Sequence, residues 1–209
     1  MKNLVYLFFL SLIIWQCSPV NSSRLNLREN LAGKSLYQST KDCIIDFDDF
    51  DKITRIRIIG LKNERLFTFT HEKLSNVFVD RPFMETLGSL SKNNKNEYFV
   101  LLTFIIDTKY VKSTYNGIST SNMLRISLIN GEPIFLTNIL NDQGKIDKNT
   151  GALTYTGIFP VSKKNLKMLG KYEMDKIGVM WNGGFEEYNV FNLDLFRRQY
   201  KCLKDFKFK

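Results

Sequence analysis

The sequence has a single histidine among its 209 residues, which limits the sites that the chain can build. A histidine-rich metal centre is excluded, and any serine or cysteine nucleophile with a histidine base must use His71. His71 follows an apolar, strand-like segment and has Glu72 beside it, as is typical of an ordinary surface loop. Cys43 is the candidate thiol partner for such a base, but nothing in the sequence brings the two residues together.

Motifs of several common enzyme classes are also missing. There is no glycine-rich phosphate loop, no G-x-S-x-G elbow and no cysteine pair at metal-binding spacing. Glu186 and Glu187 are adjacent on a predicted strand, so their side chains point to opposite faces and cannot form a close catalytic pair. Other carboxylates stay available to a hydrolase, but no pattern pairs them. We therefore predict a protein that is not an enzyme and that uses no cofactor and no metal.

Two acidic segments are the remaining candidates for metal binding. Residues 46–51 (DFDDFD) gather four carboxylates, but Phe47 and Phe50 stand where a calcium loop needs polar ligands. Residues 142–151 (DQGKIDKNTG) hold further oxygen ligands but lack the closing glutamate of such a loop. We interpret both segments as turns, the first of them leading into a strand at Ile53.

No apolar run is long enough to cross a bilayer, which takes about 20 residues, but the chain starts with a shorter one. Lys2 precedes an apolar stretch from Leu4 to Trp15, and small polar residues follow it. A charged start followed by such a stretch is typical of a secretory signal. We therefore predict that residues 1–16 are a signal peptide and that the protein is exported.

The end of this leader resembles the lipobox of bacterial lipoproteins, with the aliphatic Ile14 followed by Trp15, Gln16 and Cys17. The family normally has small residues just before the cysteine, where this chain has Trp15 and Gln16. The resemblance implies that Cys17 carries lipid and anchors the protein to a membrane of the bacterial envelope. The alternative is cleavage after Ser22, which would release a periplasmic or secreted protein.

The rest of the chain divides into a tether and one domain. Residues 17–38 are rich in Ser, Asn and Pro and have no long apolar period, which indicates a linker. Residues 39–209 have the usual size of one globular domain with its own core. Cys43 and Cys202 lie near the two ends of this domain and form an even pair once Cys17 is lipidated or removed. This favours a disulfide, with two buried thiols as the alternative.

Strand patterns dominate the domain. Alternating or continuous apolar residues predict strands within residues 51–59, 65–70, 97–106, 123–140, 152–162 and 177–191. Residues 61–64 are expected to join the first two strands as a hairpin loop. The turns of two further hairpins are expected at Asn130–Gly131 and at residues 182–184.

Helix patterns are fewer. Helical spacing predicts short helices within residues 80–94, 162–172 and 192–206. Ser162 is expected to cap the second helix and Gly170 to end it, and Asn192 is expected to cap the third. The fold class is therefore β-rich α+β, either an antiparallel sheet or a β-sandwich, with two or three short helices that include a C-terminal helix.

Positive charge is in surplus, at +9, and falls to +8 when residues 1–16 and their one lysine are removed. The basic residues cluster at Lys163, Lys164, Lys167 and Lys171 and again at Arg197, Arg198, Lys201, Lys204, Lys207 and Lys209. Such clusters are typical of solvated helix faces, and a patch for lipid headgroups or an acidic ligand is the alternative. Export argues against nucleic acid as a partner.

Trp181, Phe185 and Tyr188 flank a predicted hairpin turn and are the candidate binding surface. Exposed rings at such a turn can stack on sugars or contact a protein. Core packing is the competing interpretation, because Trp181 shares one strand face with Ile177 and Val179.

Together these features predict an exported, lipid-anchored envelope protein that binds a protein, a glycan or a toxin. A secreted or periplasmic hydrolase that uses carboxylates is one alternative. A structural lipoprotein of the envelope is the other.

Overall fold

The computed structural model describes residues 43–108 and 111–208. The predicted signal peptide (1–16), the lipidation candidate Cys17, the whole predicted tether (17–38) and residues 39–42 of the predicted domain lie outside the described residues. Within them, the chain forms eleven strands, three α-helices and one 3₁₀ turn, and every strand pairing is antiparallel. The predicted β-rich α+β class is therefore confirmed.

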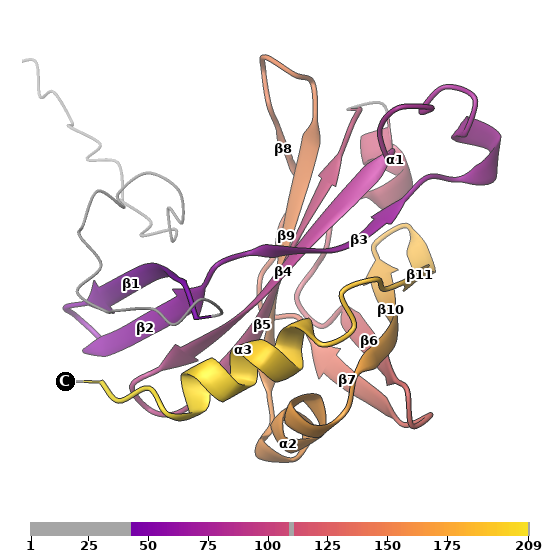
Figure 1. Ribbon diagram of the computed structural model, residues 1–209. Coiled ribbons are helices and arrows are strands. Elements are labelled where there is room, and N and C mark those ends of the chain that lie inside the picture. The colour runs from indigo at the N-terminus through magenta and orange to yellow at the C-terminus, as the bar shows by residue number, and fades with distance from the viewer. Residues whose placement is uncertain (1–42, 109–110, 209) are drawn as a thin grey trace, which may run out of the picture. The chain divides into compact units, whose positions relative to one another are not determined.

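The larger sheet has seven strands, in the order β1-β2-β4-β5-β9-β8, and β3 pairs with β4 beside β2. These strands are β1 (Ile45–Asp51), β2 (Ile56–Leu61), β3 (Glu64–Phe69), β4 (Met84–Asn93), β5 (Tyr98–Ile106), β8 (Lys145–Ile146) and β9 (Leu153–Val161). The predicted apolar strand at 97–106 is thus β5, with β4 and β9 on its two edges (Figure 1). Alternate residues of β5 and β9 line one buried face of the sheet: Val100, Leu102, Phe104, Ile106, Leu153, Tyr155 and Phe159.

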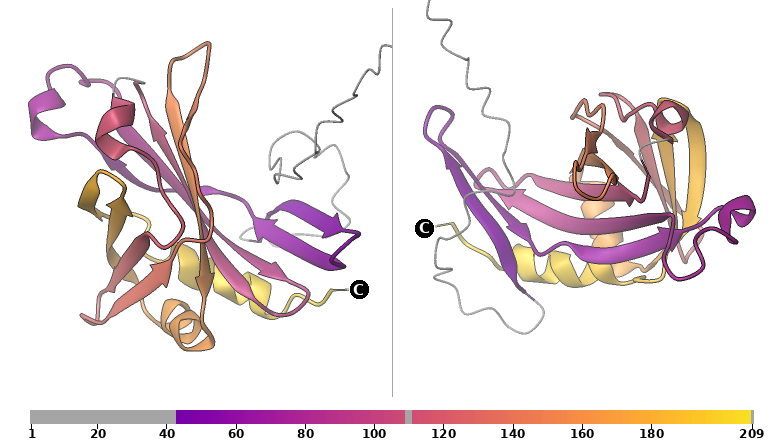
Figure 2. Two further views of the ribbon diagram at one scale, coloured as in Figure 1. Left: turned by 180° about the vertical axis from the view of Figure 1, so that it is seen from behind. Right: turned by 90° about the horizontal axis from the view of Figure 1, so that it is seen from above.

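The smaller sheet has four strands, in the order β11-β10-β6-β7. They are β6 (Met123–Leu128), β7 (Pro133–Thr137), β10 (Met174–Trp181) and β11 (Gly184–Asn189). Its inner face packs on the buried face of the larger sheet. The rings of Phe104 and Trp181 are 4.7 Å apart, as are those of Phe67 and Tyr188. The two sheets therefore share one core (Figure 2).

Helices cover the part of the buried face that the smaller sheet leaves open. The helices are α1 (Lys112–Tyr115), α2 (Lys163–Lys171) and α3 (Leu195–Lys204), and the 3₁₀ turn is Glu72–Leu74. α3 lies along β4, where the ring of Phe196 comes close to Gly88. α2 packs on α3, because Gly170 has no side chain and leaves room for the ring of Tyr200.

The disulfide between Cys43 and Cys202 joins the start of the described chain to α3, across a sequence separation of 159 residues. This confirms the predicted pairing. A buried lysine adds a second contact at the same end of the helix. Lys92 Nζ donates to the backbone oxygens of Leu203 at 3.0 Å and Phe206 at 2.9 Å. A cation is favoured at this end, where the helix leaves carbonyl groups without partners.

The prediction of a helix at residues 80–94 was wrong, because most of this segment is β4. Phe83, Leu87 and Leu90 do have helical spacing, but β4 pairs with β5 along its whole length. Strand neighbours on both edges supply the backbone hydrogen bonds that a helix would have made internally.

The hairpin expected at residues 61–64 is also absent. β2 and β3 do not pair with each other within the described chain, and both pair with β4. Gly60 lies opposite Ser91 and Glu64 opposite Gly88, so the second strand continues the first after a short interruption. The sequence shows the interruption but not which strand lies beside it.

Three further local predictions need correction. Residues 46–51 form most of β1 instead of a turn, and Ile53 lies in the exposed turn that follows. Gly170 lies inside α2, where Tyr200 packs on it, and does not end the helix. Asn192 does not cap α3, because its amide donates to the backbone oxygen of Arg65, and Asp194 takes the N-cap position.

One predicted cap and two predicted hairpins are confirmed. Ser162 caps α2, and its hydroxyl accepts from the backbone nitrogen of Asn165 at 3.2 Å. Hairpins form at both predicted glycine turns, between β6 and β7 and between β10 and β11. In the first, Gly131 takes the positive φ of +85° and the loop is longer than the two-residue turn expected from Asn130–Gly131.

Candidate binding surface

The three aromatic residues predicted as a binding surface are not on one face of the smaller sheet. Trp181 and Tyr188 are each 3% exposed and point into the core, whereas Phe185 is 47% exposed on the opposite side. Phe185 and Tyr188 are three positions apart in β11, and an odd separation in a strand places side chains on opposite faces. Only Phe185 is therefore available to a ligand.

The inward pair belongs to a buried hydrogen-bonded group. The Trp181 indole donates to the Tyr188 hydroxyl at 3.1 Å, and that hydroxyl donates to the Glu186 carboxylate. Burial raises the pKa of Tyr188 and Tyr115, and the Glu186 carboxylate raises both further. Both phenols therefore stay protonated and act as neutral hydrogen-bonding groups that satisfy buried polar atoms.

The outward side of the smaller sheet carries a different set of side chains, which we call the outer face. It consists of Met123, Arg125, Ser127, Pro133, Phe135, Thr137, Lys176, Gly178, Met180, Phe185, Glu187 and Asn189. In the pairing register, Phe185 lies beside Met180 on the neighbouring strand. Arg125 lies between Gly178 on one side and Phe135 on the other. Arg125 thus lies near the centre of the sheet, with Phe135 beside it and both polar and apolar side chains around it.

A missing side chain at Gly178 shapes this face. A β-carbon built on Gly178 would lie 2.4 Å from Cζ of Phe185 and 3.5 Å from Cβ of Arg125. The ring of Phe185 therefore rests on the backbone of Gly178 and leans toward Arg125. Glycine has this role in a strand where another group must approach the backbone closely.

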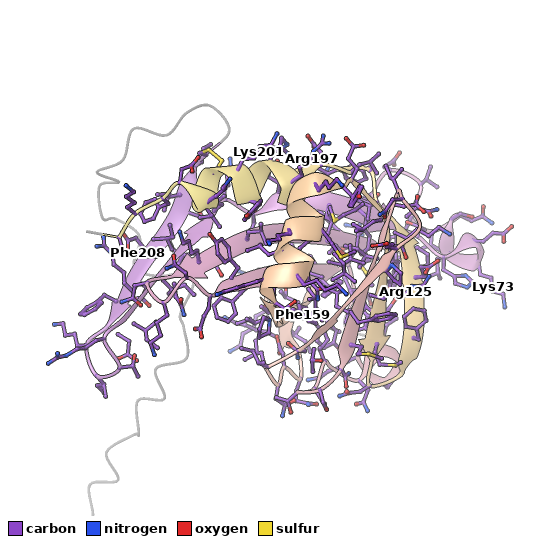
Figure 3. The ribbon with its side chains drawn as sticks, turned by 90° about the horizontal axis from the view of Figure 1, so that it is seen from below. Lys73, Arg125, Phe159, Arg197, Lys201 and Phe208 are labelled. Atoms are coloured by element: carbon purple, nitrogen blue, oxygen red, sulfur yellow. A yellow bond between two sulfur atoms is a disulfide. The ribbon has the colours of Figure 1, made fainter. Side chains whose placement is uncertain are left out.

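The arginine at the centre is only loosely paired. Its guanidinium Nη2 is 3.5 Å from the Glu187 carboxylate, and Lys176 Nζ shares the same carboxylate at 3.3 Å. The Nε of Arg125 is buried without a hydrogen-bond partner, while the side chain as a whole is 41% exposed. Arginine with unused donors is suited to a carboxylate or phosphate group. Figure 3 labels Arg125 on β6, apart from the basic residues of α3.

The exposed rings make this arrangement unusual for a solvated surface. Phe135 is 53% exposed and Met123 45% exposed, and both lie on the same sheet face as Phe185. Single exposed apolar residues need no explanation, but a group of them on one face is typical of an interaction site. Aromatic residues and arginine are also the types that contribute most to binding energy at interfaces.

The other residues considered in the sequence have structural roles. His71 caps the 3₁₀ turn, with its imidazole accepting from the backbone nitrogen of Lys73 at 3.2 Å. Cys43 is in the disulfide and offers no thiol. Residues 142–151, predicted as a turn, contain the short strand β8 and a turn after it. The Asp142 carboxylate accepts the backbone N–H groups of Gly144 and of Thr156 in β9, and Asp147 accepts those of Asn149 and Thr150. Across residues 43–108 and 111–208, no three His, Cys, Asp or Glu side chains gather as metal ligands.

The predicted binding surface did not include Arg125, Phe135, Met123 or Met180. The signal was the alternation within residues 123–137 and 174–181, where the residues out of phase with the core include bulky apolar ones. The alternation does not predict which residues of the four strands lie next to one another, because this depends on the order in which the strands pair.

None of the helices in the described chain is both long enough and apolar enough to cross a membrane. Comparison of the chain with protein-family models, with curated proteins and with solved structures finds no match.

Proposed function

We propose that the protein is an exported, lipid-anchored protein of the bacterial envelope that works as a non-enzymatic binding module through its outer face. The observation that supports binding is the loosely paired Arg125 beside exposed aromatic side chains on a sheet face. The leader and the lipobox-like end at Cys17 support export and anchoring. The disulfide supports export as well, because such bonds persist in oxidising compartments.

The chemistry of the outer face favours a ligand with an acidic group beside an apolar or planar surface. Arg125 and Lys176 carry two positive charges and share the single negative charge of the Glu187 carboxylate. An envelope protein, an acidic glycan or a toxin with an exposed carboxylate would fit this arrangement. Nucleic acid is not among the proposed partners, because export separates the protein from it.

Site-specific photo-crosslinking in the producing cell tests this proposal. A photoreactive phenylalanine analogue would replace Phe185, and in a matched control it would replace Phe191, which is 55% exposed outside the outer face. We expect a discrete adduct from position 185, none from position 191, and loss of the adduct when Arg125→Gln is added. Adducts of equal yield from both positions, or from neither, would reject the outer face as the binding surface.

A further inference from the structure

The positive charge of the chain is concentrated in one layer of the structure. Residues 162–173 and 192–208, which contain α2 and α3 and which we call the α2–α3 layer, carry nine Lys or Arg and three Asp or Glu. Their net charge of +6 accounts for most of the +9 of the whole chain. The two helices pack against each other on one side of the larger sheet (Figure 1).

The acidic residues of this layer mostly neutralise its arginines. Arg197 is 2.7 Å from Glu173, and Arg198 pairs with Asp194 and with Glu64 of β3. Seven exposed lysines form no ion pair with the described residues: Lys163, Lys164, Lys167, Lys171, Lys201, Lys204 and Lys207. Figure 3 shows Arg197 and Lys201 projecting from α3 on the side away from the sheet. The layer therefore has an uncompensated positive surface.

The disulfide connects this surface to the N-terminal part of the chain. Cys43 is bonded to Cys202 within α3, with the two Cα atoms 5.5 Å apart. The described chain therefore begins next to α3, whereas the strands of the smaller sheet lie away from the C-terminal end of that helix (Figure 2). The exposed carboxylates of β1 follow Cys43 directly, but they belong to the edge of the larger sheet and not to the layer.

We infer that the α2–α3 layer docks on the anionic phospholipid headgroups of the membrane to which the protein is anchored. This inference rests on the export that the proposed function includes. Clustered lysines near an anionic bilayer are attracted to it, and this attraction falls off within the Debye length, about 8 Å at physiological salt. A polybasic surface also strengthens the hold of a lipid anchor.

Vesicle cosedimentation of the exported Cys17→Ser chain tests the inference without any contribution from a lipid anchor. The vesicles are phosphatidylcholine with and without phosphatidylglycerol. One variant changes Lys163, Lys164, Lys167 and Lys171 to Gln, which retains helix propensity. The matched control changes the exposed Lys73, Lys95, Lys145 and Lys148 to Gln, with the same loss of charge outside the layer.

We expect binding to the phosphatidylglycerol vesicles only, weakened at least about tenfold in the α2 variant and by high salt, and nearly unchanged in the control. Equal weakening in both variants would mean that vesicle binding depends only on the net charge of the protein, and would overturn the assignment to this layer. Absence of vesicle binding, or tighter binding to soluble polyglutamate than to vesicles, would overturn a membrane surface. Thermal melting of each variant verifies its folding. Every vesicle experiment uses Cys17→Ser, so its result does not depend on lipidation or on crosslinking at Phe185. Failure of the membrane-docking inference can therefore be distinguished from failure of the proposed function.

Discussion

The side chain of Gln199 completes the hydrogen bonding of a strand that it does not belong to: its Oε1 accepts from the backbone nitrogen of Leu90 at 2.6 Å. On one edge of β4, Leu90 pairs with Val100 of β5. On the other edge it lies opposite the interruption between β2 and β3, and no residue of these two strands pairs with it. The Gln199 amide also donates to the backbone oxygen of Lys62 at 3.0 Å, within the interruption. One buried glutamine thus joins α3 to both sides of the break in the sheet.

Gln199→Leu should destabilise the protein by about 1–3 kcal/mol, because it leaves the buried N–H of Leu90 without an acceptor. Urea denaturation followed by circular dichroism measures the change. Gln143→Leu is the matched control, since Gln143 is exposed and should alter the free energy of unfolding by less than about 0.5 kcal/mol. Equal stability of wild type and Gln199→Leu would mean that another group satisfies Leu90.

Reduction of the Cys43–Cys202 disulfide should lower the free energy of unfolding by about 3–5 kcal/mol, because the bond closes a loop of 159 residues in the unfolded chain. Melting with and without reductant measures this. The double variant Cys43→Ser, Cys202→Ser is the control and should melt at the same temperature in both conditions. Non-reducing peptide mapping should give one peptide pair linked through Cys43 and Cys202. Two free thiols would contradict a stabilising role for this bond.

Acid should weaken the contact between β3 and α3 at Glu64. Burial raises the pKa of Glu64, but hydrogen bonds from Arg198 and Gln199 outweigh it, so the pKa is lower than the ordinary 4.5. A carboxyl with a depressed pKa contributes stability above its unfolded pKa and loses it as the pH falls through the folded value. Urea midpoints measured downward from pH 4.5 should therefore fall less steeply for Glu64→Gln than for wild type. Glu72→Gln, at an exposed position, is the control and should follow the wild-type curve.

The sequence predicted most strands of this fold because their apolar residues alternate or run continuously, as β5 and β9 show. The prediction failed at β4, where the spacing of Phe83, Leu87 and Leu90 fits a helix as well as a strand with apolar side chains on both faces. The decision depends on partners: β2, β3 and β5 all hydrogen-bond to β4, and this pairing is not local in sequence. The same reason explains why residues 61–64 looked like a hairpin loop.

The candidate surface was harder to predict than the fold. Trp181 is in phase with Ile177 and Val179, which already favoured its burial, and Trp181 is buried. Tyr188 is buried as well, because the pairing of β10 with β11 places it on the same face of the sheet. Arg125 gave no local signal, because its meaning depends on Gly178 and Phe135 from neighbouring strands. A cross-strand surface of this kind needs the order of strands, which no single segment contains.

Gly178→Ala should alter the outer face while leaving the fold intact. The new β-carbon would displace the ring of Phe185 from the backbone, and a ring that is 47% exposed can move into solvent. We expect a change in the free energy of unfolding below about 1 kcal/mol, together with a lower yield of the crosslink adduct from a photoreactive group at Phe135. Gly131→Ala is not a suitable control because Gly131 has a positive φ, so Ala152→Gly, outside the outer face, serves instead. A large loss of stability would show that the ring cannot move.

The identity of the N-terminal group should follow from intact mass and membrane partitioning of the protein expressed in a bacterium, wild type beside Cys17→Ser. Lipid mass on the wild type alone, with loss of membrane partitioning in the variant, is the expected outcome, because only the Cys17 thiol can accept the lipid. Cys17→Ser keeps Cys43 and Cys202, so its disulfide and melting temperature should equal those of the wild type. An unlipidated product cut near Ser22 in both would contradict anchoring and make soluble ligands the better search, while leaving the outer face as the surface through which to find them.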